Sequence, residues 1–292
     1  MAVSSKTAHD RRPRFDSMIE RARNFIWHNA RTLEQRWFEH AFDGGSGDAV
    51  VRAVLAYRND DGGYGHGLEP DHRGPTSQPL HALRALQMFA EVSAPEQAES
   101  VLGWLAATCP DGSVPFGMST SKGHPVAPWI TLDDQGGLLL TAQIAAALHA
   151  LDVAHPWLEK ATGYCWEQID ALEETHPYEL RAAVMFLDEV PDRERAELAA
   201  ARIGQLKPST EGYEVGEGMA PHFFAATPAS LARAWFSDTE LEQDLDELQA
   251  GQQEDGGWNF GFPAFTPVVE FEWRSIATVD ALLTLRNYGR IS

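Results

Sequence analysis

The amino-acid sequence predicts an all-α protein built from repeated helical hairpins. Apolar residues recur at intervals of three and four along most of the chain, which is the spacing of one helix face. Convincing alternation of the kind that marks β-strands is missing from nearly all of it. Glycine-rich turns recur at Asp61-Gly62, Asp111-Gly112, Glu211-Gly212 and Asp255-Gly256. Turns at such spacing indicate a structural repeat of roughly 40–50 residues, with a degenerate unit around residues 171–180.

The first elements along the chain are short amphipathic helices. The apolar face of the first contains Phe15, Met18, Ile19, Ala22, Phe25 and Ile26, and that of the second contains Leu33, Trp37 and Phe38. Asp48 is a suitable N-cap for a third helix, which is expected to end at Asp61-Gly62-Gly63. Thr76 or Ser77 can cap the fourth, whose apolar residues are Leu80, Leu83, Leu86 and Phe89.

The second helix of each hairpin is more uniformly apolar than the first. The four segments concerned are TSQPLHALRAL, TAQIAAALHAL, TPASLARAW and SIATVDALLTL. A helix that is apolar on most sides belongs to an inner layer, where it packs on more than one face. Inner and outer helices in alternation form an open solenoid or a closed ring, and five to six hairpins suit closure.

Composition restricts the class of partner and the compartment. The chain has 292 residues and a net charge of 23 − 43 = −20 without a basic block, which argues against nucleic acid and anionic membranes as partners. The most apolar run, GGLLLTAQIAAALHAL, is broken by Gln143 and His149 and is too short to span a bilayer. Cys109 and Cys165 have no metal-type spacing and no signal peptide opens the chain, so a reduced, cytoplasmic, soluble protein is expected. Residues 1–13 are expected to be a disordered tail and residues 14–292 a single domain.

The Asp-Gly-Gly-aromatic segment occurs twice, at Asp61–Tyr64 and at Asp255–Trp258. The glycines permit a positive φ where an outer helix stops, and the aspartate can accept hydrogen bonds from backbone amides across the turn. Gln252 lies three residues before Asp255 and is placed to bind the next repeat. These features predict a structural motif that joins repeats.

The segment Gln252-x-x-Asp255-Gly256-Gly257-Trp258 resembles the QW repeat of squalene-hopene cyclases, and similar turns occur in protein prenyltransferase β subunits. Asp61-Gly62-Gly63-Tyr64 is a second copy, and the turns at Asp111 and Glu211 are weaker ones. The resemblance implies an α/α toroid, a ring of helical hairpins around an inner barrel, over roughly residues 15–290. Toroids of this kind host several chemistries, so the resemblance addresses the fold more than the reaction.

Four loops that lead into inner helices are rich in charged and aromatic residues. In a toroid they would converge at one end of the barrel and form a pocket with aromatic walls and an acidic rim. The first two loops contribute His66, Glu69, Asp71, His72 and Arg73, and then Trp129, Asp133 and Asp134. The last two contribute Glu214, Glu217 and His222, and then Trp258, Phe260, Glu270, Glu272, Trp273 and Arg274.

Resemblance to the cyclases implies an isoprenoid ligand and a carbocation cyclisation started by protonation. Asp133 and Asp134 are then the candidate acids, although Thr131 stands where the first aspartate of the family's Asp-x-Asp-Asp motif would be. Replacement of Asp134 by asparagine is expected to abolish turnover on that hypothesis. The loop aromatics would line the pocket, and Arg73 or Arg274 would hold an anionic head group.

Two other classes of function stay open. Carbohydrate chemistry would use aromatic platforms and paired carboxylates, such as Glu69 with Asp71 or Glu270 with Glu272. A non-catalytic binding protein would keep the toroid without the reaction. Neither cysteine follows an aspartate as in the zinc motif of prenyltransferases, no Asp-Asp-x-x-Asp is present for magnesium, and His66 with His72 matches no standard metal spacing, so no metal or other cofactor is expected.

Overall fold

The computed structural model describes residues 16–206 and 220–292, and this part of the chain is mostly α-helical, as predicted. Phe15, Glu214, Glu217 and the Glu211-Gly212 turn lie outside the described residues, as does the tail predicted for residues 1–13. The helices are α1 (Asp16–Asn29), α2 (Thr32–Phe42), α3 (Gly47–Leu55), α4 (Pro79–Glu91), α5 (Ala98–Thr108), α6 (Leu138–Ala150), α7 (Pro156–Ala171), α8 (Pro177–Glu189), α9 (Arg193–Ile203), α10 (Pro221–Phe224), α11 (Asp238–Ala250) and α12 (Pro267–Asn287). Short 3₁₀ helices are η1 (Pro95–Gln97), η2 (Ser119–Ser121), η3 (Gly204–Leu206) and η4 (Leu231–Trp235), and β1 (Val114–Pro115) pairs antiparallel with β2 (Gly136–Gly137).

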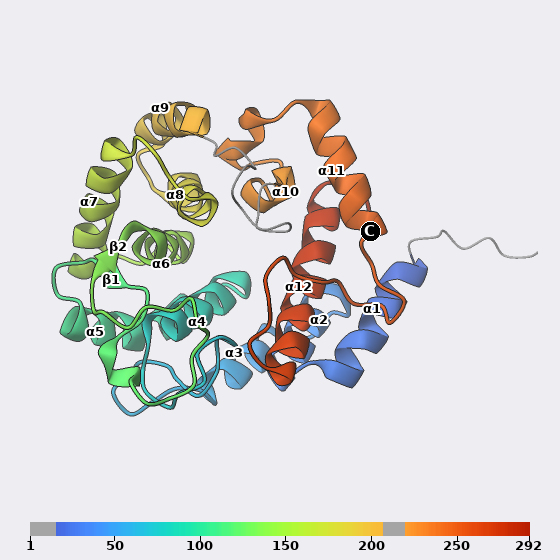
Figure 1. Ribbon diagram of the computed structural model, residues 1–292, viewed down its shortest axis with the longest axis horizontal. Helices are drawn as coiled ribbons and strands as arrows, with labels where there is room; N and C mark the ends of the chain where they lie inside the picture. The colour runs from blue at the N-terminus through green and yellow to red at the C-terminus, as the bar shows by residue number, and fades with distance from the viewer. Residues whose placement is uncertain (1–15, 207–219) are drawn as a thin grey trace, which may run out of the picture.

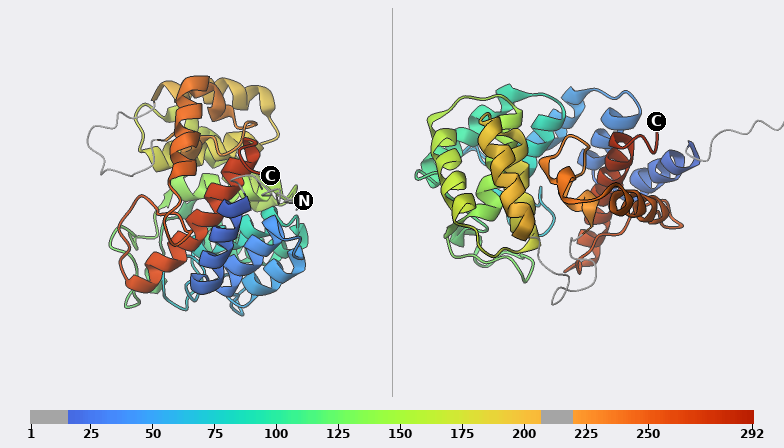
Figure 2. Two further views of the ribbon diagram at one scale, coloured as in Figure 1. Left: turned by 90° about the vertical axis from the view of Figure 1, so that its right-hand side faces the viewer. Right: turned by 90° about the horizontal axis from the view of Figure 1, so that it is seen from above.

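The helices lie in two layers around the middle of the molecule. Figure 1 shows the odd-numbered helices toward the periphery and the even-numbered helices toward the centre. Successive inner helices pack on one another, α4 on α6 and α6 on α8. The last helix, α12, packs on both α1 and α2, and Figure 2 shows α12 beside α1. Segments from the two ends of the chain are therefore in direct contact.

Burial distinguishes the two layers as the apolar pattern predicted. In α4 and α6 most side chains are buried on several faces, whereas α9 and α11 are buried along one side. One expected inner helix differs. The segment TPASLARAW forms only the five-residue η4, and its Ser230 side chain accepts the hydrogen bond that caps this short element.

Helix ends differ in detail from the prediction. Ser46, not Asp48, is the N-cap of α3, and α3 ends at Leu55 rather than at the Asp61 turn. The cap of α4 is Gln78, with Pro79 at its first position and no side-chain cap. Ser77 cannot serve there because its Oγ donates to Asp61 Oδ1 at 2.7 Å.

Three of the glycine-rich turns share one geometry. The first glycine has a positive φ in each, +87° at Gly62, +91° at Gly112 and +95° at Gly256. In each, the preceding aspartate accepts a hydrogen bond from the backbone N–H two residues later, at 2.9 Å for Asp61, 3.2 Å for Asp111 and 3.1 Å for Asp255. The aspartate and the glycine are thus required by the backbone of the turn.

Each turn packs against the next outer helix. A Cβ at Gly62 would lie 2.9 Å from the Ser100 carbonyl oxygen in α5, and one at Gly112 would lie 2.7 Å from the Ala161 nitrogen in α7. At Gly256 the added atom would overlap the carbonyl oxygen of Arg21 in α1. Gln252 Nε2 donates to the carbonyl oxygen of Met18, also in α1, at 2.9 Å. The motif joins neighbouring repeats, and its last copy joins the end of the chain to the beginning.

Candidate functional site

The loop between α3 and α4 carries five of the predicted site residues and is tied to the loop that precedes α6. The Arg73 N–H donates to the carbonyl oxygen of Pro125 at 2.9 Å, and the Ala127 N–H donates to that of Asp71 at 2.7 Å. His66 has a φ of +61° and its Nε2 lies 3.0 Å from Asn59 Oδ1, so it faces away from the buried residues of the loop. These contacts fix the backbone on both sides of Asp71.

Asp71 connects three of the predicted loops. Its Oδ2 accepts from Trp129 Nε1 at 3.2 Å, and its Oδ1 accepts from Trp273 Nε1 at 2.9 Å. Burial raises the pKa of the Asp71 carboxyl, and the two indole N–H groups counteract that rise. The structure therefore brings Asp71 and Trp129 together with Trp273, which lies in α12 (Pro267–Asn287) rather than in a loop.

The two tryptophans form a cluster of four aromatic rings with Phe260 and Phe262. Phe262 is central to it, with ring centroids 6.0 Å from Trp129, 5.2 Å from Trp273 and 4.7 Å from Phe260. Trp129 keeps 41% of its surface exposed, so the cluster is open on that side. Trp129, Phe260 and Trp273 were predicted from the sequence, whereas Phe262 is distinguished only by its contacts.

Glu69 lies beneath Asp71 with 8% of its surface exposed. Burial, with the nearby Asp71 as the next cause, raises the pKa of Glu69 to about 8. Its Oε2 is sealed from solvent and has no hydrogen-bond partner among the described residues. At neutral pH Glu69 is therefore mainly a neutral carboxylic acid.

Two neutral histidines lie beside Glu69. The Glu69 N–H donates to His81 Nδ1 at 3.0 Å, and the His81 ring meets the His72 ring edge to face at 5.0 Å. Burial lowers the pKa of both, for His72 to about 4. His81 was not predicted, because it lies in α4 among the apolar residues of an inner helix.

The arginines of this region differ in how fully they are paired with acidic side chains. Arg31 binds Glu34 through two hydrogen bonds of 3.0 and 2.7 Å, and Arg73 binds Glu272. Arg84, in α4, is 92% buried and forms no hydrogen bond to any described residue. Its ion-pair partner Glu34 lies 3.8 Å away.

Unsatisfied polar atoms concentrate at one place. Nine buried side-chain nitrogen or oxygen atoms of the described residues have no hydrogen-bond partner, and six of them belong to Glu69, His72, His81 and Arg84. Buried polar atoms are normally paired with protein groups or with water. We call these four residues together with Asp71 the Glu69 cluster, and this concentration makes it the candidate functional site.

Asp133 and Asp134 lie apart from the Glu69 cluster, on an exposed stretch of loop. Asp134 has a φ of +59°, and its Oδ1 accepts from the Ser119 backbone N–H at 2.7 Å. The hydrogen bonds to Ser119 lower the pKa of Asp134 and keep it ionised. A carboxylate in that state is poorly suited to donate a proton at neutral pH.

Three of the remaining predicted residues have structural partners, and a fourth is exposed. Arg274 forms two hydrogen bonds to Asp255 in the turn, and Trp258 is buried with its Nε1 donating to the carbonyl oxygen of Leu248 at 2.8 Å. His222 Nδ1 pairs with Asp244 at 2.8 Å. Glu270 is exposed at the start of α12.

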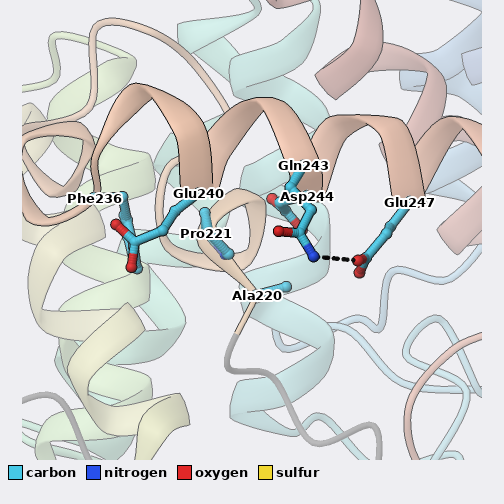
Figure 3. A pocket seen from close by; sticks show the side chains of 7 residues that line it. All are labelled: Ala220, Pro221, Phe236, Glu240, Gln243, Asp244 and Glu247. Carbon is cyan, nitrogen blue, oxygen red and sulfur yellow. Dashed lines mark hydrogen bonds between the residues drawn. The ribbon is translucent and has the colours of Figure 1, made fainter.

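Two cavities lie elsewhere in the described part of the chain. One of about 280 Å³ borders α11 and is lined by Ala220, Pro221, Phe236, Glu240, Gln243, Asp244 and Glu247 (Figure 3). Another of about 490 Å³ lies between α9, η3 and η4. Neither is lined by a member of the Glu69 cluster.

Within residues 16–206 and 220–292, no three acidic, histidine or cysteine side chains gather in a way that could hold a metal ion. None of the helices described there combines the length and apolar character needed to cross a membrane. Comparison of the sequence with protein-family models gives no match, and comparison with curated proteins gives none either.

Proposed function

We propose that this chain is an enzyme that works by general acid catalysis, with Glu69 as the acid and Asp71 as its partner carboxylate. The observation that carries the proposal is a carboxyl group with a pKa of about 8, adjacent to a second carboxyl and to unpaired buried polar atoms. Acids with pKa values shifted toward neutrality are typical of active sites that transfer protons near pH 7.

The scaffold that we propose is a closed α/α toroid. Supporting it, the turns at Gly62 and Gly112 each pack on the next outer helix along the chain, and the turn at Gly256 packs in the same manner on α1. The last repeat thus uses the same contact to reach the first. The inner-helix ends would then place the loops of Asp71, Trp129 and Trp273 at one opening of the ring.

The substrate class that the site favours is a hydroxyl-rich molecule, such as a carbohydrate. Unpaired buried donors and acceptors at His72, His81 and Arg84 require polar partners. Trp129, exposed beside them, offers a flat apolar face of the kind on which sugar rings stack. Glu69 would protonate the oxygen of the leaving group, and Asp71, held by two indole N–H groups, would act as base or nucleophile in breaking a glycosidic bond.

An isoprenoid is the second candidate, and the four-ring aromatic cluster favours it, because aromatic faces stabilise carbocations. Glu69 would supply the initiating proton in that reaction too. The charges of Arg84 and Arg181 both act on Asp280, and a hydrocarbon chain beside these groups would offer them no polar partner. This is why we place the isoprenoid second.

Measuring the turnover of single-residue variants tests whether Glu69 is the general acid. Purified protein is assayed against panels of glycans and of polyprenyl diphosphates, with products identified by mass spectrometry. Glu69→Gln is expected to reduce kcat by at least about 100-fold, because the amide cannot donate the proton, while leaving KM within a few fold. Asp134→Asn is the matched control and is expected to retain turnover. Loss of turnover in Asp134→Asn with full activity in Glu69→Gln would assign the acid to Asp134 and overturn the proposal.

A further inference from the structure

Arg84 is a buried guanidinium whose surroundings leave it without a hydrogen-bond acceptor. It stacks on the Trp37 ring at 4.8 Å, and its Nε and Nη2 are sealed from solvent without a partner among the described residues. A guanidinium has five N–H donors, and leaving several of them unpaired in the interior is strongly unfavourable.

The nearest acidic partner of Arg84 is already occupied. Both carboxylate oxygens of Glu34 accept short hydrogen bonds from Arg31, at 3.0 and 2.7 Å. Arg84 lies 3.8 Å from one of these oxygens, too far for a hydrogen bond. Two buried guanidinium groups thus share one carboxylate, and only one of them is satisfied.

Asp280 acts on Arg84 from another inner helix and also interacts with Arg181. The Asp280 side chain in α12 is exposed, although its protein surroundings raise the pKa of its carboxyl, and the charges of Arg84 and Arg181 counteract that rise. Arg181 in α8 stacks on the Phe223 ring at 4.8 Å and donates through Nε to the Phe223 carbonyl oxygen at 2.9 Å. No ion pair within 4.0 Å joins Asp280 to either arginine among the described residues, and the Asp280 side chain is exposed, so these groups do not form a closed salt bridge.

We propose that Arg84 binds an anionic oxygen group, a carboxylate or a phosphate, on a ligand that enters the centre of the molecule. A planar guanidinium recognises either group through paired hydrogen bonds. Nη1 of Arg84 is not among its sealed nitrogens and would make the first contact, and the side chains that seal Nη2 would have to shift for the second. Asp280 would accept hydrogen bonds from neighbouring hydroxyls of the same ligand. The link to turnover rests on the function proposed above, whereas the binding itself does not require it.

The same role was predicted from the sequence for Arg73 and Arg274. Both are engaged, Arg73 by Glu272 and Arg274 by two hydrogen bonds to Asp255. Arg84 was missed because it appears in the sequence as one of a few polar residues in a mainly apolar inner helix.

Thermal unfolding of the full chain in the presence of simple anions tests the proposal. The probes are sodium glucuronate and sodium phosphate, each compared with sodium chloride at equal ionic strength. Arg84→Met removes the guanidinium and keeps a long side chain. Arg195→Met is the matched control, because Arg195 also stacks on a tryptophan, Trp166 at 4.1 Å, but lies in the outer helix α9.

We expect glucuronate or phosphate to raise the Tm of the wild type and of Arg195→Met above the value in chloride, and to leave Arg84→Met unchanged. Calorimetric titration is expected to show at least about tenfold weaker binding by Arg84→Met, with Arg84→Lys intermediate because it keeps the charge but not the paired geometry. A response to glucuronate alone identifies a sugar acid, and a response to phosphate alone identifies a phosphorylated ligand.

Two results would overturn the proposal: equal anion effects in wild type and Arg84→Met, or no effect of either anion on the wild type. Arg84→Met is expected to fold with an unchanged or higher Tm in chloride, because an unpaired buried charge is removed. Anion binding that depends on Arg84, combined with full turnover by Glu69→Gln, would refute the acid and retain the anion site.

Discussion

At the scale of single residues, the unusual property of this protein is that several ionisable side chains are buried together without full pairing. Burial and the neighbouring Asp71 favour the neutral form of Glu69, while the same enclosure keeps His72 and His81 uncharged. Two residues of this set, His81 and Arg84, could not be identified from the sequence. Each stands in α4 where the helical periodicity indicates only an inner face, and nothing local marks it as unpaired.

Motif spacing alone did not indicate the surroundings of the two aspartates that were predicted as acids from the sequence. Asp133 and Asp134 are adjacent carboxylates, the pattern expected of a proton donor, but the chain exposes them and gives Asp134 a backbone N–H to bind. Glu69 and Asp71 are separated only by a proline. Asp71 accepts hydrogen bonds from Trp129 and Trp273 of the aromatic cluster, which are far from it in the sequence. Desolvation depends on tertiary structure, so the shift in pKa could not be read from spacing.

At the scale of elements, the helix–turn units were the most predictable part of the molecule. Helical periodicity and glycine position predicted the alternation of helices and the role of the turns, because both depend on local sequence. Helix ends were less predictable, because side chains such as Ser77 are used in tertiary hydrogen bonds rather than as caps. The short η4 in place of a full inner helix was likewise not evident from TPASLARAW.

The substitution Gly256→Ala tests how much the turn and its contact with α1 contribute to stability. Gly256 has a φ of +95° and no room for a Cβ against Arg21 in α1, so the substitution is expected to lower the free energy of unfolding by about 2–4 kcal/mol. Gly44→Ala is the matched control, with a φ of +70° and no atom within 4 Å of the added Cβ. It is expected to cost about 1 kcal/mol, from backbone strain alone. Equal losses in urea denaturation would show that the contact with α1 contributes little.

At the scale of the whole molecule, the contact between the last turn and α1 is one that the proposed closed ring requires and an open solenoid does not. The terminal repeats of a solenoid contact one neighbour only and open more easily than central ones. Here α1 receives the hydrogen bond from Gln252 and packs on α12. The sequence indicated hairpins in sufficient number for closure, but the contact between the chain ends is visible only in three dimensions.

Hydrogen exchange of the backbone amides tests this closure. The amides of α1 are expected to be protected to a degree similar to those of α6, and Gln252→Ala is expected to reduce protection in α1 selectively. Gln253→Ala is the matched control, because Gln253 Nε2 donates within its own turn, to the carbonyl oxygen of Gly251 at 2.6 Å. Rapid exchange throughout α1 in the wild type would indicate an open array instead.

The stability of wild type and Glu69→Gln as a function of pH reports whether Glu69 is protonated in the folded protein. Between the ordinary glutamate value of 4.5 and the folded value of about 8, the folded protein holds a proton that the unfolded chain has released. Wild-type stability is therefore expected to fall relative to Glu69→Gln as pH rises through this window, and the difference to level off above pH 8. Its total is expected to reach about 3–5 kcal/mol in urea denaturation, with the exposed variant Glu270→Gln following the wild type. A difference in the free energy of unfolding between wild type and Glu69→Gln that stays constant from pH 5 to pH 9 would contradict a protonated Glu69, because Glu69 would then ionise as an ordinary surface glutamate does.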